Sequence, residues 1–539
     1  PPNISTMLQA SSAVVLVLVF CVLLIACANV ASLLLARAEA RQKEISIRLA
    51  IGANRGRLIC QLLTESLLLS AVGGGLGLAI AFWSSRVFPT LIPSFGVPIA
   101  FDTSPDATVL AFTLGLTLVT GCLFGLVPAL QASKPDLVPT LKGESGSQGP
   151  RRRLPLRHAL VAFQVAASVI LLVGAGLFIR SLQQERGIDP GFRVDNLLVA
   201  NLDPSLFGYD ASRGQQLYDD LSERLTALPG VQAVGTAEIA PLTFANSQQW
   251  GIEVEGYEPA PDEPMSLDYN IVSHGYFATL EIPLLAGRAF TASDDAAGTP
   301  VVIVNQAMAD RFWGGDALGQ RIRMGSVWRE VVGVTSTGRY RTLRETPKPF
   351  LYLPLRQSWE PSQEIFVRTA GDPITLLAAA RGVLRELDPN LPFTNVRTMQ
   401  QHAEGALFLS QMGARVIGLF GGLALVLSTL GLFGLLSHAV VRRTREIGIR
   451  MSLGANRSDV FAQLLREGLT LTGFGLALGL LAALATGRLA SGLLFGLSGS
   501  DPRTFFAVTL ILLATSVLAI TVPALRATRV RPTVALRYE

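Results

Sequence analysis

Two short segments of this sequence repeat one pattern of charged and small residues. In each, a glutamate is followed four residues later by an arginine, and a Gly-Ala pair follows the arginine after four more positions. The residues are Glu44, Arg48, Gly52, Ala53, Glu446, Arg450, Gly454 and Ala455. Opposite charges at i and i+4 stabilise a helix turn, and glycine commonly ends a helix. The pattern predicts two short amphipathic helices, suited to lying on anionic lipid or to docking a partner protein.

The apolar residues of the first segment are Ile45, Ile47, Leu49 and Ile51. Their spacing predicts an apolar side on the short helix. A second pair of acids, Glu65 and Glu467, lies a few residues inside long apolar stretches. An intramembrane carboxylate is costly and usually faces a bundle interior, but an earlier helix start would leave it at the membrane surface. The sequence leaves both positions open, and neither requires proton transport.

Residues for other chemistry are sparse. His274 and His402 have no second His or Cys at metal-ligand spacing, and Asp219–Asp220 and Asp294–Asp295 are predicted to be solvated acids. None of the lysines follows a glycine, so a G-x-x-x-x-G-K-[ST] phosphate loop is absent from this sequence. We therefore expect no catalytic residue, metal or cofactor in this chain; any ATP and Mg²⁺ would be bound by a separate ATPase.

Long apolar helices must position these residues. Half of the 539 residues are hydrophobic and 16% are charged, against about a quarter in soluble proteins. Seven nearly uncharged runs lie within stretches long enough to cross a bilayer, which takes about 20 residues. They are Ala13–Ala28, Leu67–Phe82, Val109–Leu130, Leu160–Ile179, Val416–Leu436, Leu469–Ala485 and Phe505–Val522. The fold class predicted is a membrane all-α helical bundle of about seven transmembrane helices.

The charge distribution predicts the side on which each loop lies. Segments 37–57, 132–157, 441–459 and 526–539 together hold 21 basic and 7 acidic residues, whereas 181–410 holds 18 basic and 28 acidic residues. Loops rich in Lys and Arg stay in the cytoplasm. The four basic segments, including the C-terminus, are therefore predicted to be cytoplasmic, and the large polar segment to lie outside.

An internal repeat connects the loops to the helices. Residues 41–66 align without gaps to 443–468, every position shifted by 402, and VPALQASK at 127–134 matches VPALRATR at 522–529. Each unit is thus predicted to be helix, basic loop, helix, short outer loop, helix. In each, an asparagine, Asn54 or Asn456, is placed to cap the second helix.

Residues 181–410 are predicted to form an α/β (α+β) domain inserted into the bundle. Strand-helix-strand units at 197–239 and 364–396 flank a region of short strands at about 250–356. We predict two subdomains: the flanking units folding together, and the β-rich middle.

Several segments resemble one known family. The E-I-[GS]-I-R-x-x-[IL]-G-A-N-R loop followed by Q-L-L-x-E, present twice, is similar to the FtsX-like permease domain. GIDPGFRVDNLLVANLDPS (187–205) and PVVIVNQAMADRFWGGDALGQRIRMG (300–325) resemble a MacB-type periplasmic core domain. The chain thus resembles the duplicated MacB/FtsX-like ABC transporter permeases, in which each half has one helix, a periplasmic domain and three helices. The first helix and first periplasmic domain of that pattern are missing, as a truncated N-terminus would explain.

The resemblance implies five regions. These are a first FtsX-like unit at 1–135, a basic cytoplasmic linker at 136–157, a transmembrane stalk helix at 158–182, a MacB-like periplasmic core domain at 183–410 and a second FtsX-like unit at 411–539.

It also implies a permease subunit of a type VII, mechanotransmission ABC transporter in the bacterial inner membrane. A separate MacB- or LolD-like ABC ATPase would dock on the two short helices, and the motion would serve periplasmic substrate export or extraction. A periplasmic adaptor or outer-membrane channel is a candidate partner, membrane lipid is expected, and nucleic acid is not. Two alternatives stay open: an FtsX-like regulator of a periplasmic partner, and an ion-coupled carrier using Glu65 and Glu467.

Overall fold

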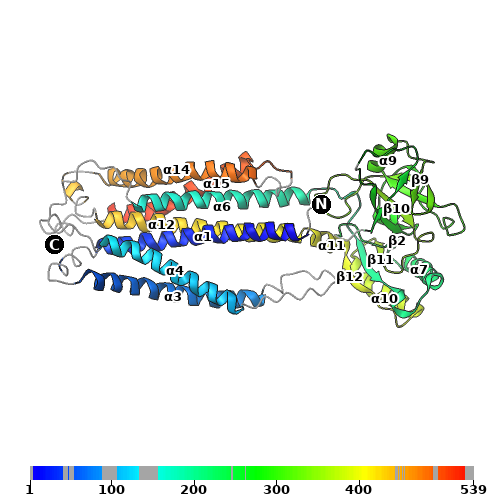
Figure 1. The fold of residues 1–539 in the computed structure, drawn as a ribbon, viewed down its shortest axis with the longest axis horizontal. Helices are drawn as coiled ribbons and strands as arrows, with labels where there is room; N and C mark the ends of the chain where they lie inside the picture. Colours follow the sequence, from blue (N-terminus) through cyan, green and yellow to red (C-terminus); the bar gives the residue numbers. More distant parts are fainter. Residues whose placement is uncertain are drawn as a thin grey trace. The chain divides into compact units, whose positions relative to one another are not determined.

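The structure, a computed structural model, consists of a helical unit within residues 1–183 and 410–539 and an α/β unit within residues 184–409 (Figure 1). The residues it describes are 4–40, 47, 54–87, 106–132, 156–243, 247–261, 263–442, 447, 449–451, 453, 456–489 and 496–528.

The helical unit is built from long helices. They are α1 (Ile4–Ala40), α3 (Arg55–Val87), α4 (Ala107–Ala132), α6 (Leu156–Arg186), α12 (Phe408–Arg442), α14 (Arg457–Leu489) and α15 (Pro502–Thr528). Among the described residues, six helices are long and apolar enough to cross a membrane, and α4 contributes a shorter apolar stretch, Ala107–Cys122. The predicted total of seven spans therefore depends on α4.

Several helices extend beyond the apolar runs that predicted them. α3 begins at Arg55 and α14 at Arg457, each 12 residues ahead of the expected run at Leu67 or Leu469. At about 1.5 Å per residue, a 33-residue helix is about 50 Å long, against about 30 Å for the hydrocarbon core. α3 and α14 must therefore each tilt within the bilayer or project from it at one or both ends.

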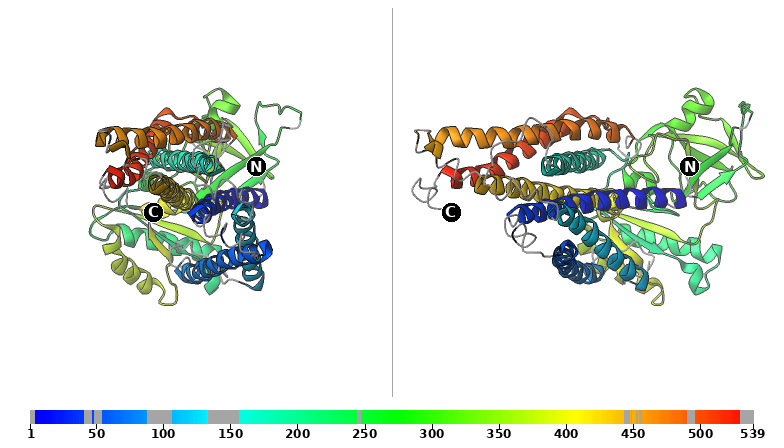
Figure 2. Two further views of the ribbon diagram at one scale, coloured as in Figure 1. Left: turned by 90° about the vertical axis from the view of Figure 1, so that its left-hand side faces the viewer. Right: turned by 60° about the vertical axis from the view of Figure 1, so that its left-hand side comes forward.

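α6 lies at the centre of the helical unit (Figure 2). Val169 and Val173 of α6 pack with Leu476 of α14 and Val508 of α15. On another side, the fully buried Ile25 of α1 packs against Ala167 of α6 and Ala424 of α12. Apolar contacts on several sides of α6 explain why it is the most buried of the membrane-capable helices that the structure describes.

Strands of the α/β unit form one mixed sheet of 12 strands. They are β1 (Leu197–Leu202), β2 (Val231–Ala237), β3 (Ser247–Trp250), β4 (Glu253–Val254), β5 (Ser266–Val272), β6 (Leu284–Gly287), β7 (Val301–Asn305), β8 (Arg321–Met324), β9 (Val327–Thr335), β10 (Phe350–Pro354), β11 (Gln363–Thr369) and β12 (Thr394–Thr398). Their order is β12-β1-β11-β2-β5-β10-β7-β9-β8-β4, with β3 paired to β5 and β6 to β9.

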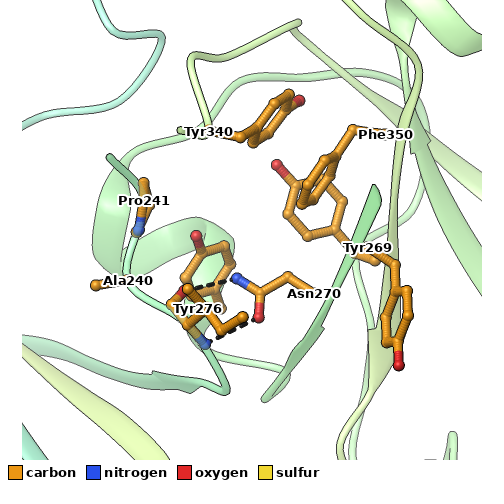
Figure 3. A pocket seen from close by; sticks show the side chains of 9 residues that line it. Ala240, Pro241, Tyr269, Asn270, Tyr276, Tyr340 and Phe350 are labelled. Carbon is orange, nitrogen blue, oxygen red and sulfur yellow. Dashed lines mark hydrogen bonds between the residues drawn. The ribbon is translucent and has the colours of Figure 1, made fainter. Parts of the chain in front are cut away.

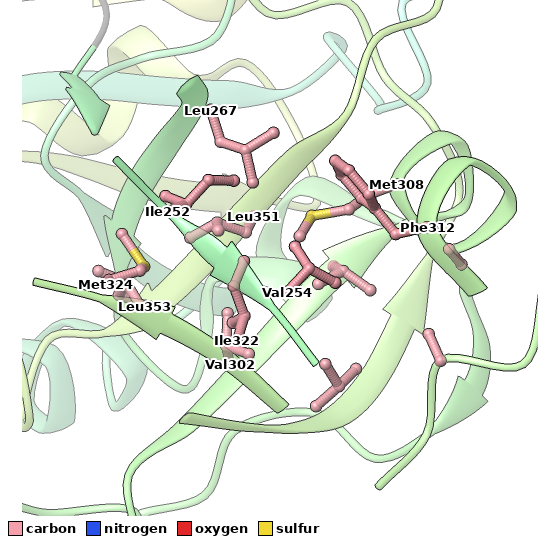
Figure 4. Close-up of a cluster of buried hydrophobic side chains, with 14 of the residues drawn as sticks. Ile252, Val254, Leu267, Val302, Met308, Phe312, Ile322, Met324, Leu351 and Leu353 are labelled. Carbon is pink, nitrogen blue, oxygen red and sulfur yellow. The ribbon is translucent and has the colours of Figure 1, made fainter. Parts of the chain in front are cut away.

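The α/β unit has two hydrophobic cores, and helices contribute side chains to both. The helices of the unit are α7 (Ala211–Thr226), α8 (Tyr276–Leu280), α9 (Gln306–Trp313), α10 (Leu377–Leu387) and α11 (Met399–Ala406). α7 and α10 contribute Leu221 and Leu384 to a core with Val367 of β11. α9 contributes Met308 and Phe312 to the other, which continues into the central strands (Figure 4).

One sheet runs through both predicted subdomains. β5, a strand that the sequence pattern did not predict, pairs in parallel with β10 and meets the flanking strand β2 at Ala237 and Val272. The sheet is continuous because β5 pairs with β10 of the middle region and with β2 of the flanking region. The two predicted subdomains therefore have separate hydrophobic cores but share one sheet.

Candidate functional site

The candidate site is the pair of short repeated segments between the first and second helices of each unit. Of the eight residues predicted there, Arg450 lies among the described residues and is exposed. The other seven, Glu44, Arg48, Gly52, Ala53, Glu446, Gly454 and Ala455, lie outside them. The geometry of the site therefore comes from Ile47 in the first copy and from residues 447, 449–451 and 453 in the second.

Ile447 fixes the second segment to the helical unit. Its side chain is only 7% exposed and packs with Val440 of α12, Val460 of α14 and Ala524 of α15. Met451, one turn further on, packs against the same cluster. These contacts join the segment to three helices at once.

The opposite side of the segment is exposed and apolar. Ile449 is 40% exposed and Leu453 is 82% exposed, and the Leu453 amide donates to the Ile449 carbonyl at 3.0 Å, as in a helix turn. The sequence predicted one apolar side, but the structure divides these residues between a buried and an exposed side. In the first copy, Ile47 is the equivalent of Ile449 and is exposed to a similar extent, 43%. The exposed apolar side chains of Ile449 and Leu453 suit either of the contacts that the sequence left open, with lipid or with a partner protein.

Polar contacts join the segment to α14. The Arg450 guanidinium donates to Gln463 Oε1 at 3.1 Å, and Gln463 Nε2 donates to Glu467 Oε1 at 3.3 Å. Glu467 is half-buried and lies ten residues after the first residue of α14, as Glu65 does in α3. Sequence reasoning treated Arg450 and Glu467 as separate features, whereas the structure links them through Gln463.

Caps define where the following helices begin. Asn54 Oδ1 accepts from the Gly56 amide at 3.0 Å, so its predicted capping of α3 is confirmed. At α14 the Asp459 carboxylate accepts from the Asn456 amide at 3.2 Å, the reciprocal half of a capping box.

At the other end of the helical unit, an ion pair that sequence reasoning missed joins α6 to α15. Arg180 of α6 pairs with Asp501, whose carboxylate also accepts from the Thr504 amide at 2.9 Å and the Thr504 hydroxyl at 2.6 Å. Asp501 thus caps α15 and binds α6 with the same carboxylate. An aspartate three residues before a threonine at a helix start was the available signal.

Polar side chains inside the helical unit were also missed. Asn29 Nδ2 donates to the Leu427 carbonyl at 2.7 Å, and Ser168 Oγ donates to the Ala424 carbonyl at 3.0 Å. Both contacts join a helix to α12. Buried side-chain to backbone bonds of this kind hold membrane helices together without a hydrophobic driving force.

Two of the acids predicted to be solvated, Asp294 and Asp219, make ion pairs in the α/β unit. Asp294 is only 6% exposed and makes two bonds with Arg288, at 2.7 and 2.8 Å; the prediction of a solvated acid is therefore wrong there, because the guanidinium compensates burial. The hydrogen bonds from Arg288 lower the pKa of the Asp294 carboxyl. The Asp219 carboxylate accepts a hydrogen bond from the Arg356 guanidinium at 2.6 Å. The described residues include no group of three His, Cys, Asp or Glu that could hold a metal.

Aromatic residues surround a small pocket in the α/β unit (Figure 3). Tyr340 stacks on Phe350 with ring centroids 3.7 Å apart, and Asn270 bridges to the backbone of Ile239. The cavity volume of about 10 Å³ suits no more than one water molecule. A larger open hollow of about 550 Å³ is lined by polar residues that include Asp195, Asp372 and Glu404.

Two protein families match this chain. The FtsX-like permease C-terminal domain matches residues 16–137 and 418–532, and the MacB-like periplasmic core domain matches residues 165–385. The first match falls on both repeats of the helical unit, and the second on α6 and most of the α/β unit.

Curated relatives are similar over part of the chain. An uncharacterized ABC transporter permease, YvrN of Bacillus subtilis, is 27% identical over 50% of this chain and 69% of its own length. The pyoverdine export ATP-binding/permease protein PvdT of Pseudomonas entomophila is 28% identical over 48% of this chain and 41% of its own. The macrolide export ATP-binding/permease protein MacB of Marinobacter nauticus is 36% identical over 23% and 18%.

Among solved structures, the periplasmic region of MacB from Actinobacillus actinomycetemcomitans is 16% identical, covering 42% of this chain and 96% of that one with a TM-score of 0.28.

Proposed function

This chain belongs to the MacB/FtsX-like family of ABC transporter permeases, and we propose that it couples ATP hydrolysis by a separate ABC ATPase to work in the periplasm. The proposed mechanism is mechanotransmission. The ATPase, a MacB- or LolD-like chain carrying ATP and Mg²⁺, docks on the two repeated short segments. Their displacement moves the long helices, which act on the periplasmic domain to export or extract a substrate.

One observation carries this proposal: the second segment is held on one side and exposed on the other. Ile447 fixes it to α12, α14 and α15, while Leu453 beside Arg450 is 82% exposed. A docking helix needs both properties, because it must bind a partner and must also pass force to the helices behind it. An export-type permease is favoured over a regulator because the relatives PvdT and MacB are named as export proteins.

The test is co-purification of the full chain with a MacB-like ATPase. Leu453→Asp is expected to lower the affinity by about tenfold or more, since a buried leucine is worth about 1.5–3 kcal/mol and each 1.4 kcal/mol is tenfold. Arg450→Ala with Glu446→Ala should also weaken the complex. Leu206→Asp is the matched control, because Leu206 of the α/β unit is similarly exposed, at 77%.

Retention of wild-type co-purification by Leu453→Asp would remove this segment as the docking surface. Loss of co-purification in both leucine variants would point to a general folding defect, which thermal unfolding of the two proteins would reveal. A periplasmic adaptor or outer-membrane channel as a further partner is also proposed, and cross-linking in intact cells tests it.

A further inference from the structure

Three helices of the helical unit meet at a buried pair of amide side chains. The pair is Asn29 of α1 and Gln164 of α6, and both lie against Gly431 of α12. Gln164 is fully buried, and Asn29 Nδ2 donates to the Leu427 carbonyl of α12 at 2.7 Å. Among the residues that the structure describes, Asn29 Oδ1 and both amide atoms of Gln164 have no hydrogen-bond partner. Because a buried polar group without a hydrogen bond is strongly unfavourable, these atoms need one.

Gly431 brings the two amides together. A Cβ at Gly431 would lie 2.4 Å from Asn29 Oδ1 and 2.4 Å from Gln164 Oε1, so any other residue there would push both side chains away. Since both oxygens lie this close to one point, they are no further apart than twice that distance. A half-turn of the last side-chain bond of Gln164 brings Nε2, a donor, to the place of Oε1. The two amides are therefore placed to form a hydrogen bond between α6 and α1, against the backbone of α12.

This contact joins helices that lead to different parts of the chain. The second repeated segment is connected to the α/β unit by one helix, α12, which begins at Phe408 at the end of that unit and runs to Arg442. The first repeated segment follows α1, which α3, α4 and α6 separate from the α/β unit along the chain. α6 ends at Arg186, where the chain enters the α/β unit. A bond from α1 to α6 therefore gives the first segment a short route to that unit.

We propose that Gln164 is the positioning residue through which movement of the first segment reaches α6, by a hydrogen bond from its amide to Asn29 Oδ1. This inference rests on the function proposed above. Asn29 Nδ2 is fixed to α12, so Oδ1 is held in place as the acceptor. Without the bond, the ATPase still docks and α1 still moves, but α6 follows less. The bond thus serves coupling and not docking.

The test uses the full chain with a MacB-like ATPase in lipid nanodiscs. Hydrogen exchange measured by mass spectrometry compares α1 and α6 with and without ATP, and in the wild type ATP should change the exchange of both. Gln164→Leu should leave the change in α1 and reduce that in α6 by about twofold or more. Co-purification should be unchanged, and the melting temperature should not fall, because leucine removes an unpaired amide and keeps a side chain of similar size.

A glycine pair on α12 supplies the matched control. Gly431→Ala should act like Gln164→Leu, because its Cβ would separate the two amides. Gly434→Ala should behave as the wild type, since the nearest atom to a Cβ there is Leu33 Cδ2 at 3.8 Å, an ordinary contact. Exchanging the two amides, Asn29→Gln with Gln164→Asn, keeps both groups and their summed length, and should restore the change in α6.

The possible results separate this inference from the function on which it rests. A full ATP-dependent change in α6 of Gln164→Leu would overturn the inference and leave the proposed function standing. A fall in melting temperature and co-purification, together with a smaller change in α6, would make Gln164 a folding residue and would also overturn it. A wild-type chain in which α1 does not respond to ATP would refute the proposed function, and this inference with it.

Discussion

His402 lies in the α/β unit, where its hydrogen bonds with Arg397 and Pro241 define its tautomer. Arg397 Nε can only donate, and it lies 3.1 Å from Nδ1, so Nδ1 accepts. The ring proton is then on Nε2, which donates to the Pro241 carbonyl at 2.8 Å. Burial and, second, the charge of Arg397 lower the pKa of His402 to about 4. The neutral imidazole is a structural donor and acceptor.

At this scale we predict a pH effect. The unfolded histidine has a pKa of about 6.5. Between pH 6.5 and 4 the unfolded state therefore binds more protons, and the free energy of unfolding should fall as the pH falls; above pH 6.5 this contribution is constant. Thermal unfolding followed by tryptophan fluorescence reports mainly on this unit, which contains Trp250, Trp313, Trp328 and Trp359. His402→Gln should reduce the pH dependence over this range, and an unchanged slope would contradict the assignment.

At the scale of elements, the two repeats provide a controlled comparison. Asp106 and Asp501 each cap the third helix of their unit, but only Asp501 pairs with α6. Asp106→Ala should cost about 1 kcal/mol, the usual value of an N-cap. Asp501→Ala should cost more, because it also leaves the partly buried Arg180 without its carboxylate.

The difference in melting temperature between these two variants in detergent, measured by scanning fluorimetry, reports the contribution of the link between α6 and α15. Asp501→Asn, which can still cap, should fall between the wild type and Asp501→Ala. Equal destabilisation by Asp106→Ala and Asp501→Ala would show that the ion pair contributes nothing.

At the scale of the whole molecule, the predicted topology places both repeated segments on one side of the membrane. In a cysteine-free background, Arg48→Cys and Arg450→Cys should react with an impermeant maleimide only after the inner membrane is opened. Leu206→Cys in the periplasmic core domain should react without that treatment. Labelling of Arg48→Cys and Arg450→Cys from opposite sides would rule out a common ATPase docking on both segments.

Residue patterns alone predicted a large part of this protein. The apolar runs located the seven long helices that the structure describes in the helical unit, because a bilayer demands about 20 apolar residues in succession. The strand-helix-strand unit predicted at 197–239 is present as β1, α7 and β2, which together span residues 197–237. The internal repeat and the family resemblance also came from sequence, and the family matches support them.

Contacts between distant residues could not be predicted in this way. Local spacing cannot tell which of Ile447 and Ile449 faces the bundle, because each lies on an apolar stripe and only neighbouring helices distinguish them. The bond from Arg180 to Asp501 spans 321 residues, and β5 joins the sheet through partners on both sides. Gly475 of α14 lies against α6, whereas a Cβ at its repeat equivalent Gly73 of α3 would meet no atom of the described residues within 4 Å. That difference belongs to packing, which depends on the arrangement of the helices in space.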